Sequence, residues 1–266
     1  MGESKLYLSL ILPAYNEEKR IAETVSTVRA YLDSPQIWAA TPQGSDRTLQ
    51  GSDRTPEGWA GTSCPGPYEI IVVNDGSTDS TAEVLSGVPG IQVISYQPNR
   101  GKGYAVRQGM LASKGEFVAF TDVDLSAPIE ELAKLFDAIR AGADVAIGSR
   151  SVPGARLIRR QPRYRELGGK MLNILIRFLA VPGIHDTQCG LKLFRGDLAR
   201  RVFARCILDG WGFDVEALYL ARRLGARIAE VPVRWSHDAD TRIRPLRAGL
   251  QVVRDIIRIR LHRYEI

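Results

Sequence analysis

The 266-residue sequence has no apolar run that approaches the roughly 18 residues needed to cross a bilayer as a helix. Its N-terminus also lacks the charged segment and the small-residue cleavage site of a secretory signal, so we expect residues 6–13 to form a first strand. With 44% hydrophobic and 25% charged residues, the composition is typical of a soluble globular protein. These features predict a protein that stays in the cytoplasm.

Cysteine is also scarce. The three cysteines, Cys64, Cys189 and Cys206, are an odd number at spacings unlike any zinc pattern. They indicate free thiols in a reducing compartment, with no predicted chemistry.

Two common glycine motifs are missing. The segment "NRGKGYAVRQG" lacks the GK[ST] ending of a P-loop, and its glycines miss the spacing of a dinucleotide fingerprint. Lys102 nevertheless lies among glycines at an expected helix start, which suits a phosphate group.

Charge is distributed unevenly along the chain, although the total is only +6. Residues 1–149 hold 12 Lys and Arg against 19 Asp and Glu, a net charge of −7, whereas residues 150–266 hold 24 against 11, a net charge of +13. The arginines of the basic half alternate with aliphatic residues rather than with stacking aromatics, which favours phosphates at a membrane surface over nucleic acid. Residues 245–264 fit a basic amphipathic helix attached to that surface, or an ordinary terminal helix with a solvated charged face.

Short β-branched runs alternate with helical patterns in the first half of the chain. This alternation predicts an α/β fold with a mostly parallel central sheet covered by helices. The expected strands are 6–13, 68–74, 91–96, 116–122 and 144–149, and the expected helices are 17–32, 77–87, 101–115 and 127–142.

Two regions depart from this alternation. Residues 33–67 repeat GSDRT and are rich in Gly, Pro, Ser and Thr, so we expect a flexible surface insertion. Residues 156–183 read as a basic loop that leads into an apolar helix. Helices at 197–207 and 213–225 and a strand within 226–236 follow, and we expect a single domain over residues 1–266.

Unusual polar residues follow the expected strands. Ligands of open parallel sheets bind outside the carboxyl ends of the strands, and the chain places Pro13, Tyr15 and Glu17 after the first strand and Asp75 after the second. Ser77, Thr78 or Asp79 can cap the next helix, but capping does not explain Asp75. We expect its carboxylate to accept a hydrogen bond from a nucleotide base.

Asp122 and Asp124 end the fourth expected strand. In an extended conformation both side chains would point the same way, and paired carboxylates are ligands that Mg²⁺ or Mn²⁺ prefers. A pair of solvated loop aspartates is the alternative. Their position after a strand, with Asp75 and Lys102 expected at the same edge, favours the metal.

The motifs "ILPAYNEE", "IVVNDGSTDST", "NRGKGYAVRQG" and "TDVDLS" resemble the successive signatures of family 2 glycosyltransferases with the GT-A fold. In the second half, "GIHDTQCGLKLF", "WGFDVEALYLA" and "AEVPVRWS" resemble the dolichyl-phosphate β-glucosyltransferases and, more distantly, the dolichyl-phosphate mannose synthases. The resemblance covers nearly the whole chain outside the 33–67 insertion.

The resemblance implies a role for each matching residue. Around the nucleotide sugar it places Pro13, Tyr15, Glu17, Asp75, Lys102 and Asp122. It makes Asp124 the main metal ligand and assigns the acceptor phosphate to Arg150 and Arg165. Where sugar and acceptor meet it places Asp186, Gln188, Asp214 and Glu216, although Asp186 and Asp214 fit equally well as residues that orient loops.

The chain departs from the mannose synthases at Ser126, where those enzymes carry a glutamine that binds the metal. His237 is a candidate replacement ligand, with an ordinary solvated histidine as the alternative.

The implied reaction is the inverting, metal-dependent transfer of a hexose, such as glucose from a UDP-sugar, to a polyprenyl or dolichyl phosphate at the cytoplasmic face of a membrane. One rival is transfer to a sugar hydroxyl, with Asp214 or Glu216 as the base. The other is a non-catalytic membrane-surface protein that binds nucleotide sugars.

Overall fold

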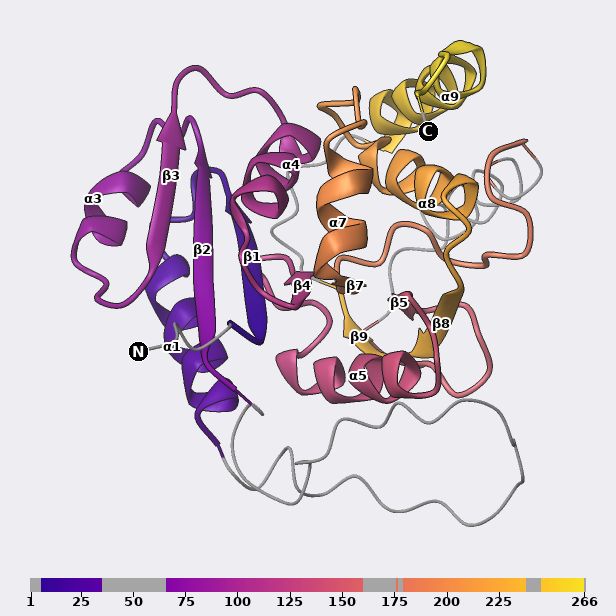
Figure 1. Cartoon of the computed structure of the whole chain (residues 1–266). Coiled ribbons are helices and arrows are strands. Elements are labelled where there is room, and N and C mark those ends of the chain that lie inside the picture. Colours follow the sequence, from indigo (N-terminus) through magenta and orange to yellow (C-terminus); the bar gives the residue numbers. More distant parts are fainter. Residues whose placement is uncertain (1–5, 35–65, 160–175, 177–178, 238–244, 266) are drawn as a thin grey trace.

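Short aliphatic runs form a seven-stranded central sheet, in the order β3-β2-β1-β4-β7-β5-β8 (Figure 1). The computed structural model describes residues 6–34, 66–159, 176, 179–237 and 245–265. All five strands expected in the first half are confirmed, and the strand expected within 226–236 joins the sheet as β8. The strands are β1 (Leu8–Ala14), β2 (Tyr68–Asp75), β3 (Gln92–Tyr96), β4 (Phe117–Phe120), β5 (Val145–Ser149), β6 (Arg156–Arg159), β7 (Lys192–Arg195), β8 (Ile228–Pro232) and β9 (Arg234–Ser236).

The sheet is mostly parallel, as the alternating pattern predicts. Only β7 is antiparallel, and it lies between β4 and β5. It had not been expected as a strand, and neither had β6, which pairs with β9 in a separate two-stranded parallel sheet. The expectation of a basic loop is therefore wrong for residues 156–159.

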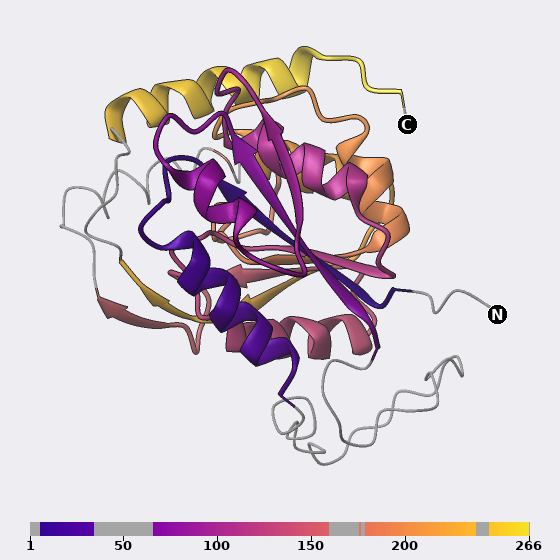
Figure 2. The same cartoon turned by 90° about the vertical axis from the view of Figure 1, so that its left-hand side faces the viewer.

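Helices cover both faces of the sheet (Figure 2). The alternate residues Leu8, Leu10 and Leu12 of β1 pack toward α1, α3 and α5, whereas Ile11 packs toward α4, α7 and α8. This alternation follows from the two-residue period of a strand. The helices are α1 (Ile21–Leu32), α3 (Thr81–Ser86), α4 (Lys102–Ala112), η1 (Ile129–Glu131), α5 (Leu132–Arg140), α7 (Gly196–Phe203), α8 (Phe213–Arg223) and α9 (Pro245–Leu261).

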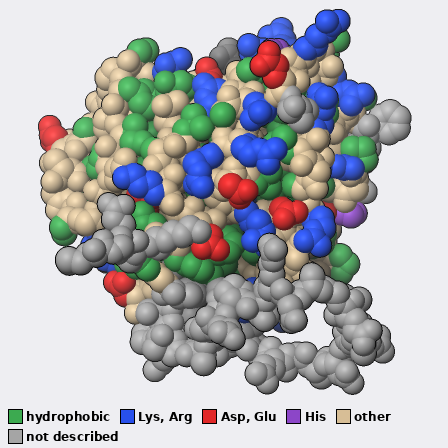
Figure 3. Space-filling model, in the orientation of Figure 1, with side chains coloured by type: hydrophobic (Ala, Val, Ile, Leu, Met, Phe, Trp, Pro, Cys, Tyr) green, Lys and Arg blue, Asp and Glu red, His purple; other side chains and the backbone are tan. Residues whose placement is uncertain are grey.

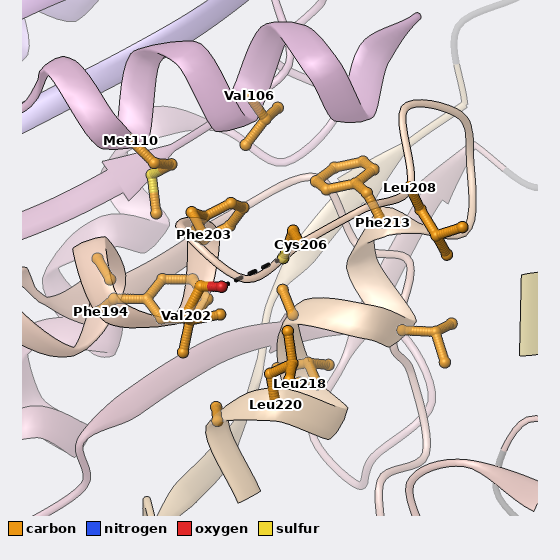
Figure 4. Close-up of a cluster of buried hydrophobic side chains, with 14 of the residues drawn as sticks. Val106, Met110, Phe194, Val202, Phe203, Cys206, Leu208, Phe213, Leu218 and Leu220 are labelled. Carbon is orange, nitrogen blue, oxygen red and sulfur yellow. Dashed lines mark hydrogen bonds between the residues drawn. The ribbon is translucent and has the colours of Figure 1, made fainter. Parts of the chain in front are cut away.

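The core under α4, α7 and α8 extends to the C-terminus. Figure 4 shows Val106 and Met110 of α4 above the aromatic rings of Phe194, Phe203 and Phe213. α9 adds Val252, Ile256 and Ile259 to this cluster. The C-terminal helix is thus part of the fold, and its exposed face alone is available to a partner.

Two expectations cannot be compared with the structure. The 33–67 insertion and the helix expected within 156–183 lie mostly outside the described residues.

Candidate active site

The polar residues that follow the strands meet at one edge of the sheet. β1, β2, β4 and β5 are parallel, so their carboxyl ends lie at this edge. β7 runs the opposite way, and its first residue, Lys192, pairs with Phe120 at the end of β4. Residues before β7 therefore join those that follow the other strands, where ligands of open α/β sheets bind.

The loops after β1 and β2 are joined by short hydrogen bonds. The Asn16 amide N–H donates to Ser77 Oγ (2.9 Å), and Asn16 Oδ1 accepts from the Thr78 amide (2.8 Å). The Glu17 amide donates to Thr81 Oγ1 (2.8 Å). These bonds fix the loop after β1. Pro13, near the end of β1, is partly buried, and Tyr15 in the loop is 42% exposed, so its ring is accessible to a ligand.

Asp75 is almost fully buried at the end of β2. Its Oδ1 accepts hydrogen bonds from the Tyr96 hydroxyl (2.9 Å) and the Arg100 amide (2.8 Å). Its Oδ2 accepts from Asn99 Nδ2 (2.9 Å) and the Gly101 amide (3.0 Å). A carboxylate offers about four acceptor positions. Asp75 therefore positions the loop before α4, and contact with a nucleotide base would require it to exchange or share one of these bonds.

Asp122 and Asp124 lie on a turn rather than on an extended strand. β4 ends at Phe120, the Leu125 amide donates to the Asp122 carbonyl (3.0 Å), and Leu125 has a φ of 45°. The expectation of two side chains on one face of an extended segment is therefore wrong, because the chain turns immediately after the strand.

Asp124 is exposed, and Asp124 Oδ1 accepts a hydrogen bond from the Ser126 amide (2.9 Å). The residue is accessible to solvent, but the atoms around its carboxyl group remove part of the hydration of that group. This loss of hydration and the charge of Asp122 raise the pKa of Asp124. A nearby cation would favour the ionised form. The turn therefore suits a cation.

Lys102 at the start of α4 reaches Asp122. Its Nζ lies 2.5 Å from Asp122 Oδ1, and both side chains are partly exposed. Burial alone would lower the pKa of Lys102, but the carboxylates of Asp122 and Asp214 outweigh burial and raise it. The lysine is therefore a cation at this edge, beside the turn that holds Asp124.

Lys192 forms a buried ion pair behind this edge. Its Nζ lies 2.5 Å from Asp214 Oδ1 and donates to the Cys189 carbonyl (2.6 Å). Burial raises the pKa of Asp214, and Lys192 opposes the rise. Sequence reasoning found Asp214 but missed Lys192, because a lysine in a short apolar segment gives no sign that its ammonium group points inward.

Arg150, at the end of β5, is bound by Asp186. Its Nε and Nη2 donate to Asp186 Oδ2 (2.7 Å) and Oδ1 (2.8 Å), and its backbone amide donates to Oδ2 as well (2.9 Å). Burial alone would raise the pKa of Asp186, but Arg150 outweighs burial and holds it below the usual value. Asp186 thus binds both the side chain and the backbone amide of Arg150, and its expected place where sugar and acceptor meet stays a prediction.

Glu230 and a hydrogen bond within the loop hold the segment that carries Asp186. Glu230 of β8 accepts from the backbone amides of His185 (2.7 Å) and Asp186 (2.9 Å). The Gln188 amide donates to Asp186 Oδ1 (3.2 Å), and Gln188 is partly exposed.

Glu216 is placed differently from the other predicted residues. It is fully buried and accepts hydrogen bonds from the amides of Ile207 (2.9 Å) and Leu208 (2.9 Å) and from the Tyr264 hydroxyl (2.6 Å). These bonds give it a positioning role, and a catalytic role for Glu216 stays a prediction that this placement does not favour.

His237 follows β9 and lies near the Asp122–Ser126 turn. The Ser236 amide donates to the Ser126 carbonyl (2.8 Å), and the imidazole stacks on Trp235 with ring centroids 5.9 Å apart. Within the described residues, no group of three His, Cys, Asp or Glu side chains is arranged to hold a metal ion. Arg165 lies outside the described residues.

This fold and edge define a class of protein. An open α/β sheet with two aspartates and a lysine beside the end of its central strand has the architecture of the GT-A glycosyltransferases. One similar structure is that of glucosyl-3-phosphoglycerate synthase from Mycobacterium tuberculosis in complex with Mn²⁺, uridine diphosphate and phosphoglyceric acid. It has a TM-score of 0.62 and 20% identity, over 96% of this chain and 78% of that one.

The sequence comparisons give the family. The Glycosyl transferase family 2 model matches residues 59–203, and the chain belongs to this family. Curated relatives named dolichyl-phosphate beta-glucosyltransferase are 35% identical in Drosophila melanogaster, over 96% of this chain and 74% of the relative, and 34% identical in Homo sapiens, over 96% and 75%. The protein is therefore a glycosyltransferase, as the motifs indicated.

Proposed function

We propose that the protein transfers glucose from UDP-glucose to a polyprenyl phosphate such as dolichyl phosphate, with inversion, to give a β-linked lipid-phosphate sugar. The observation that carries this proposal is the arrangement of charges at the carboxyl edge of the sheet. Asp122 and Asp124 supply two carboxylates beside the ammonium group of Lys102, and Arg150 adds a partly exposed cation. The names of the curated relatives support the donor sugar and the acceptor.

A phosphate acceptor needs no catalytic base. The second pKa of a phosphate monoester is about 6, so the attacking oxygen is already an anion near neutral pH. The protein needs only to orient the acceptor phosphate, and a guanidinium group suits this task because it binds phosphate with several N–H donors. Asp186 accepts from Nε and Nη2 of Arg150, so among the described residues the Nη1 donors remain available to another acceptor.

The donor diphosphate requires positive charge. Lys102 supplies one cation, and the Asp122–Asp124 pair offers the oxygen ligands that Mg²⁺ or Mn²⁺ prefers. Loss of hydration and the charge of Asp122 both raise the pKa of Asp124, and a cation beside the two carboxylates would offset both effects, so these residues fit a metal. When bound there, a divalent cation would neutralise the charge of the leaving diphosphate. His237 stays a candidate third ligand.

The rival acceptor, a sugar hydroxyl, is less favoured by the geometry. It would require a base, and both candidates have other partners, since Asp214 pairs with Lys192 and Glu216 accepts three hydrogen bonds in the core. The remaining rival, a non-catalytic binding protein, is not favoured because the relatives are enzymes.

We also propose that the protein attaches peripherally to the cytoplasmic face of a membrane, where the lipid acceptor would be found. Within the described part of the chain, no helix is long and apolar enough to span a bilayer. α9 supports peripheral attachment, because Ile257 and Leu261 are 52% and 77% exposed next to exposed arginines. Figure 3 shows Lys and Arg side chains gathered over α7, α8 and α9.

A single transfer assay tests the main proposal. The protein is incubated with radiolabelled UDP-glucose, GDP-mannose or UDP-N-acetylglucosamine, with Mg²⁺ or Mn²⁺, and with polyprenyl phosphate, and the lipids are then extracted. We expect label in the lipid only from UDP-glucose with polyprenyl phosphate and metal. Asp124→Ala should abolish transfer, whereas the control Asp137→Ala, which removes a surface ion pair with Arg140, should not. Transfer to a sugar hydroxyl, or full activity of Asp124→Ala, would contradict the proposal.

A further inference from the structure

Strand β9 contacts both sides of the candidate active site. Arg234 Nε lies 2.5 Å from Glu131 Oε1, and the Ser236 amide donates to the Ser126 carbonyl (2.8 Å), so β9 is bound to the segment that follows Asp124. Immediately before β9, the Val233 amide donates to the Ser149 carbonyl (3.2 Å), one residue before Arg150. β9 therefore connects the Asp122–Ser126 turn to the strand that carries the acceptor arginine.

Trp235, in the middle of β9, makes two ring contacts across this connection. Its side chain is buried, with 9% of the residue exposed. The Arg150 Cζ lies 5.2 Å from the centroid of a Trp235 ring, within the roughly 6 Å at which cation–π attraction is significant. The imidazole of His237 stacks on Trp235 at an interplanar angle of 29°.

These contacts restrict the orientation of Arg150. Asp186 holds one edge of the guanidinium through Nε and Nη2, and Trp235 lies against the group. With both contacts in place, the arginine side chain has little freedom to rotate, and Nη1 keeps a fixed direction. A fixed guanidinium binds a phosphate more tightly than a mobile one, because its ordering does not oppose binding.

We propose that Trp235 is a positioning residue that directs Arg150 toward the phosphate of the lipid acceptor. The proposal rests on the proposed function, in which Arg150 binds the acceptor phosphate. It assigns Trp235 no contact with the donor nucleotide. Loss of the ring should therefore affect the acceptor and leave the donor unchanged.

Steady-state kinetics and acceptor binding test the proposal. Trp235→Leu should raise the KM for polyprenyl phosphate roughly ten-fold, the size expected for loss of a partly desolvated cation–π contact, and leave the KM for UDP-glucose unchanged. Trp235→Phe keeps an aromatic ring and should retain an acceptor KM within about two-fold of the unmutated protein. Tyr219→Leu is the matched control, because it removes a similar contact with Arg223 on α8.

The deciding measurement is a double-mutant cycle, in which acceptor affinity is compared for Trp235→Leu, Arg150→Ala and the double variant. If Trp235 acts through Arg150, then Trp235→Leu should cause no further loss of acceptor affinity in an Arg150→Ala background. An equal loss in both backgrounds, or an equal rise in donor and acceptor KM, would overturn the proposal. Should Trp235→Leu fail to fold by circular dichroism, the same cycle is run with Trp235→Met, which also removes the aromatic ring.

Binding of farnesyl phosphate, measured by calorimetry without donor or metal, separates the two proposals. If the protein transfers no glucose to lipid but binds farnesyl phosphate in a manner that depends on Arg150 and Trp235, only the proposed function fails. If transfer occurs and farnesyl phosphate binding does not change in Trp235→Leu, only the role of Trp235 fails.

Discussion

Asp122 is held between a cation and a glycine, and both neighbours determine where its carboxylate lies. Lys102 Nζ contacts Oδ1 at 2.5 Å. On the other side, a Cβ atom at position 190 would lie only 2.3 Å from Oδ2, so only glycine allows this approach. Gly190 belongs to "DTQCG", one of the motifs in the second half of the chain that carried the family resemblance.

Gly190→Ala should therefore impair activity by displacing Asp122. We expect kcat/KM for UDP-glucose to fall by at least about ten-fold, while the free energy of unfolding decreases by only about 1–3 kcal/mol, the usual range for a small overpacking change. Kinetics and urea unfolding measure the two effects. Gly87→Ala is the control, since a Cβ there meets only the Val84 carbonyl at 3.5 Å. Normal kinetics for Gly190→Ala would contradict this role for the glycine.

Sequence reasoning located the acidic residues better than it assigned their partners. The spacing of Asp122 and Asp124 identified the carboxylate pair at a strand end, although not the turn on which it lies, and "NDG" identified Asp75, because strand ends and paired carboxylates leave a local pattern. Glu216 and Lys192 could not be assigned in this way. Their partners, Tyr264 and Asp214, lie 48 and 22 residues away in the chain, and only the fold brings them together.

At the scale of elements, the strands and helices with a clear period were predictable and the short ones were not. β7 has four residues and contains Lys192 and Arg195, so its sequence has neither the length nor the continuous apolar character of a buried strand. It is buried nonetheless, because it pairs with β4 and β5, and Lys192 is neutralised by Asp214. β7, which brings Gln188 to the site, thus forms because it pairs with β4 and β5, and its own sequence does not predict it.

α9 allows a test of membrane attachment. Val252, Ile256 and Ile259 pack into the core, whereas Arg254, Ile257, Arg258 and Leu261 are exposed at a spacing that puts them on one face. Replacing both apolar residues, in Ile257→Asp with Leu261→Asp, should weaken binding to vesicles that contain phosphatidylserine by roughly ten-fold or more, because it removes apolar contact and adds negative charge. Vesicle sedimentation measures this change.

The control for α9 is an exposed leucine on another helix. Leu111 on α4 is 41% exposed, and Leu111→Asp should leave vesicle binding unchanged. Both variants should unfold at nearly the temperature of the unmutated protein, because they alter exposed residues. Equal loss of vesicle binding in both variants would mean that added negative charge, and not the α9 face, explains the effect.

At the scale of the whole molecule, one sheet joins the acidic and the basic parts of the chain. β1 to β5 come from the half with a net charge of −7, and β7 and β8 come from the half with a net charge of +13. β7 is inserted between β4 and β5, so neither half can complete the sheet alone. This interleaving supports the proposal of a single domain and brings the residues proposed to bind the donor to the same edge of the sheet as Arg150.

Cooperative unfolding follows from this interleaved sheet. We expect one thermal transition for the described fold, since exposing β7 would also open the β4 and β5 edges. UDP with Mn²⁺ should raise the temperature of the whole transition. At a ligand concentration of about 100 times Kd, binding adds about 2.7 kcal/mol to the free energy of unfolding. Calorimetry with and without the ligand, and with Mn²⁺ alone as the control, measures the shift. Two separable transitions, of which UDP shifts only one, would contradict this expectation. The residues proposed to bind the donor would then belong to an independently folding unit, and the sheet would not connect them to Arg150.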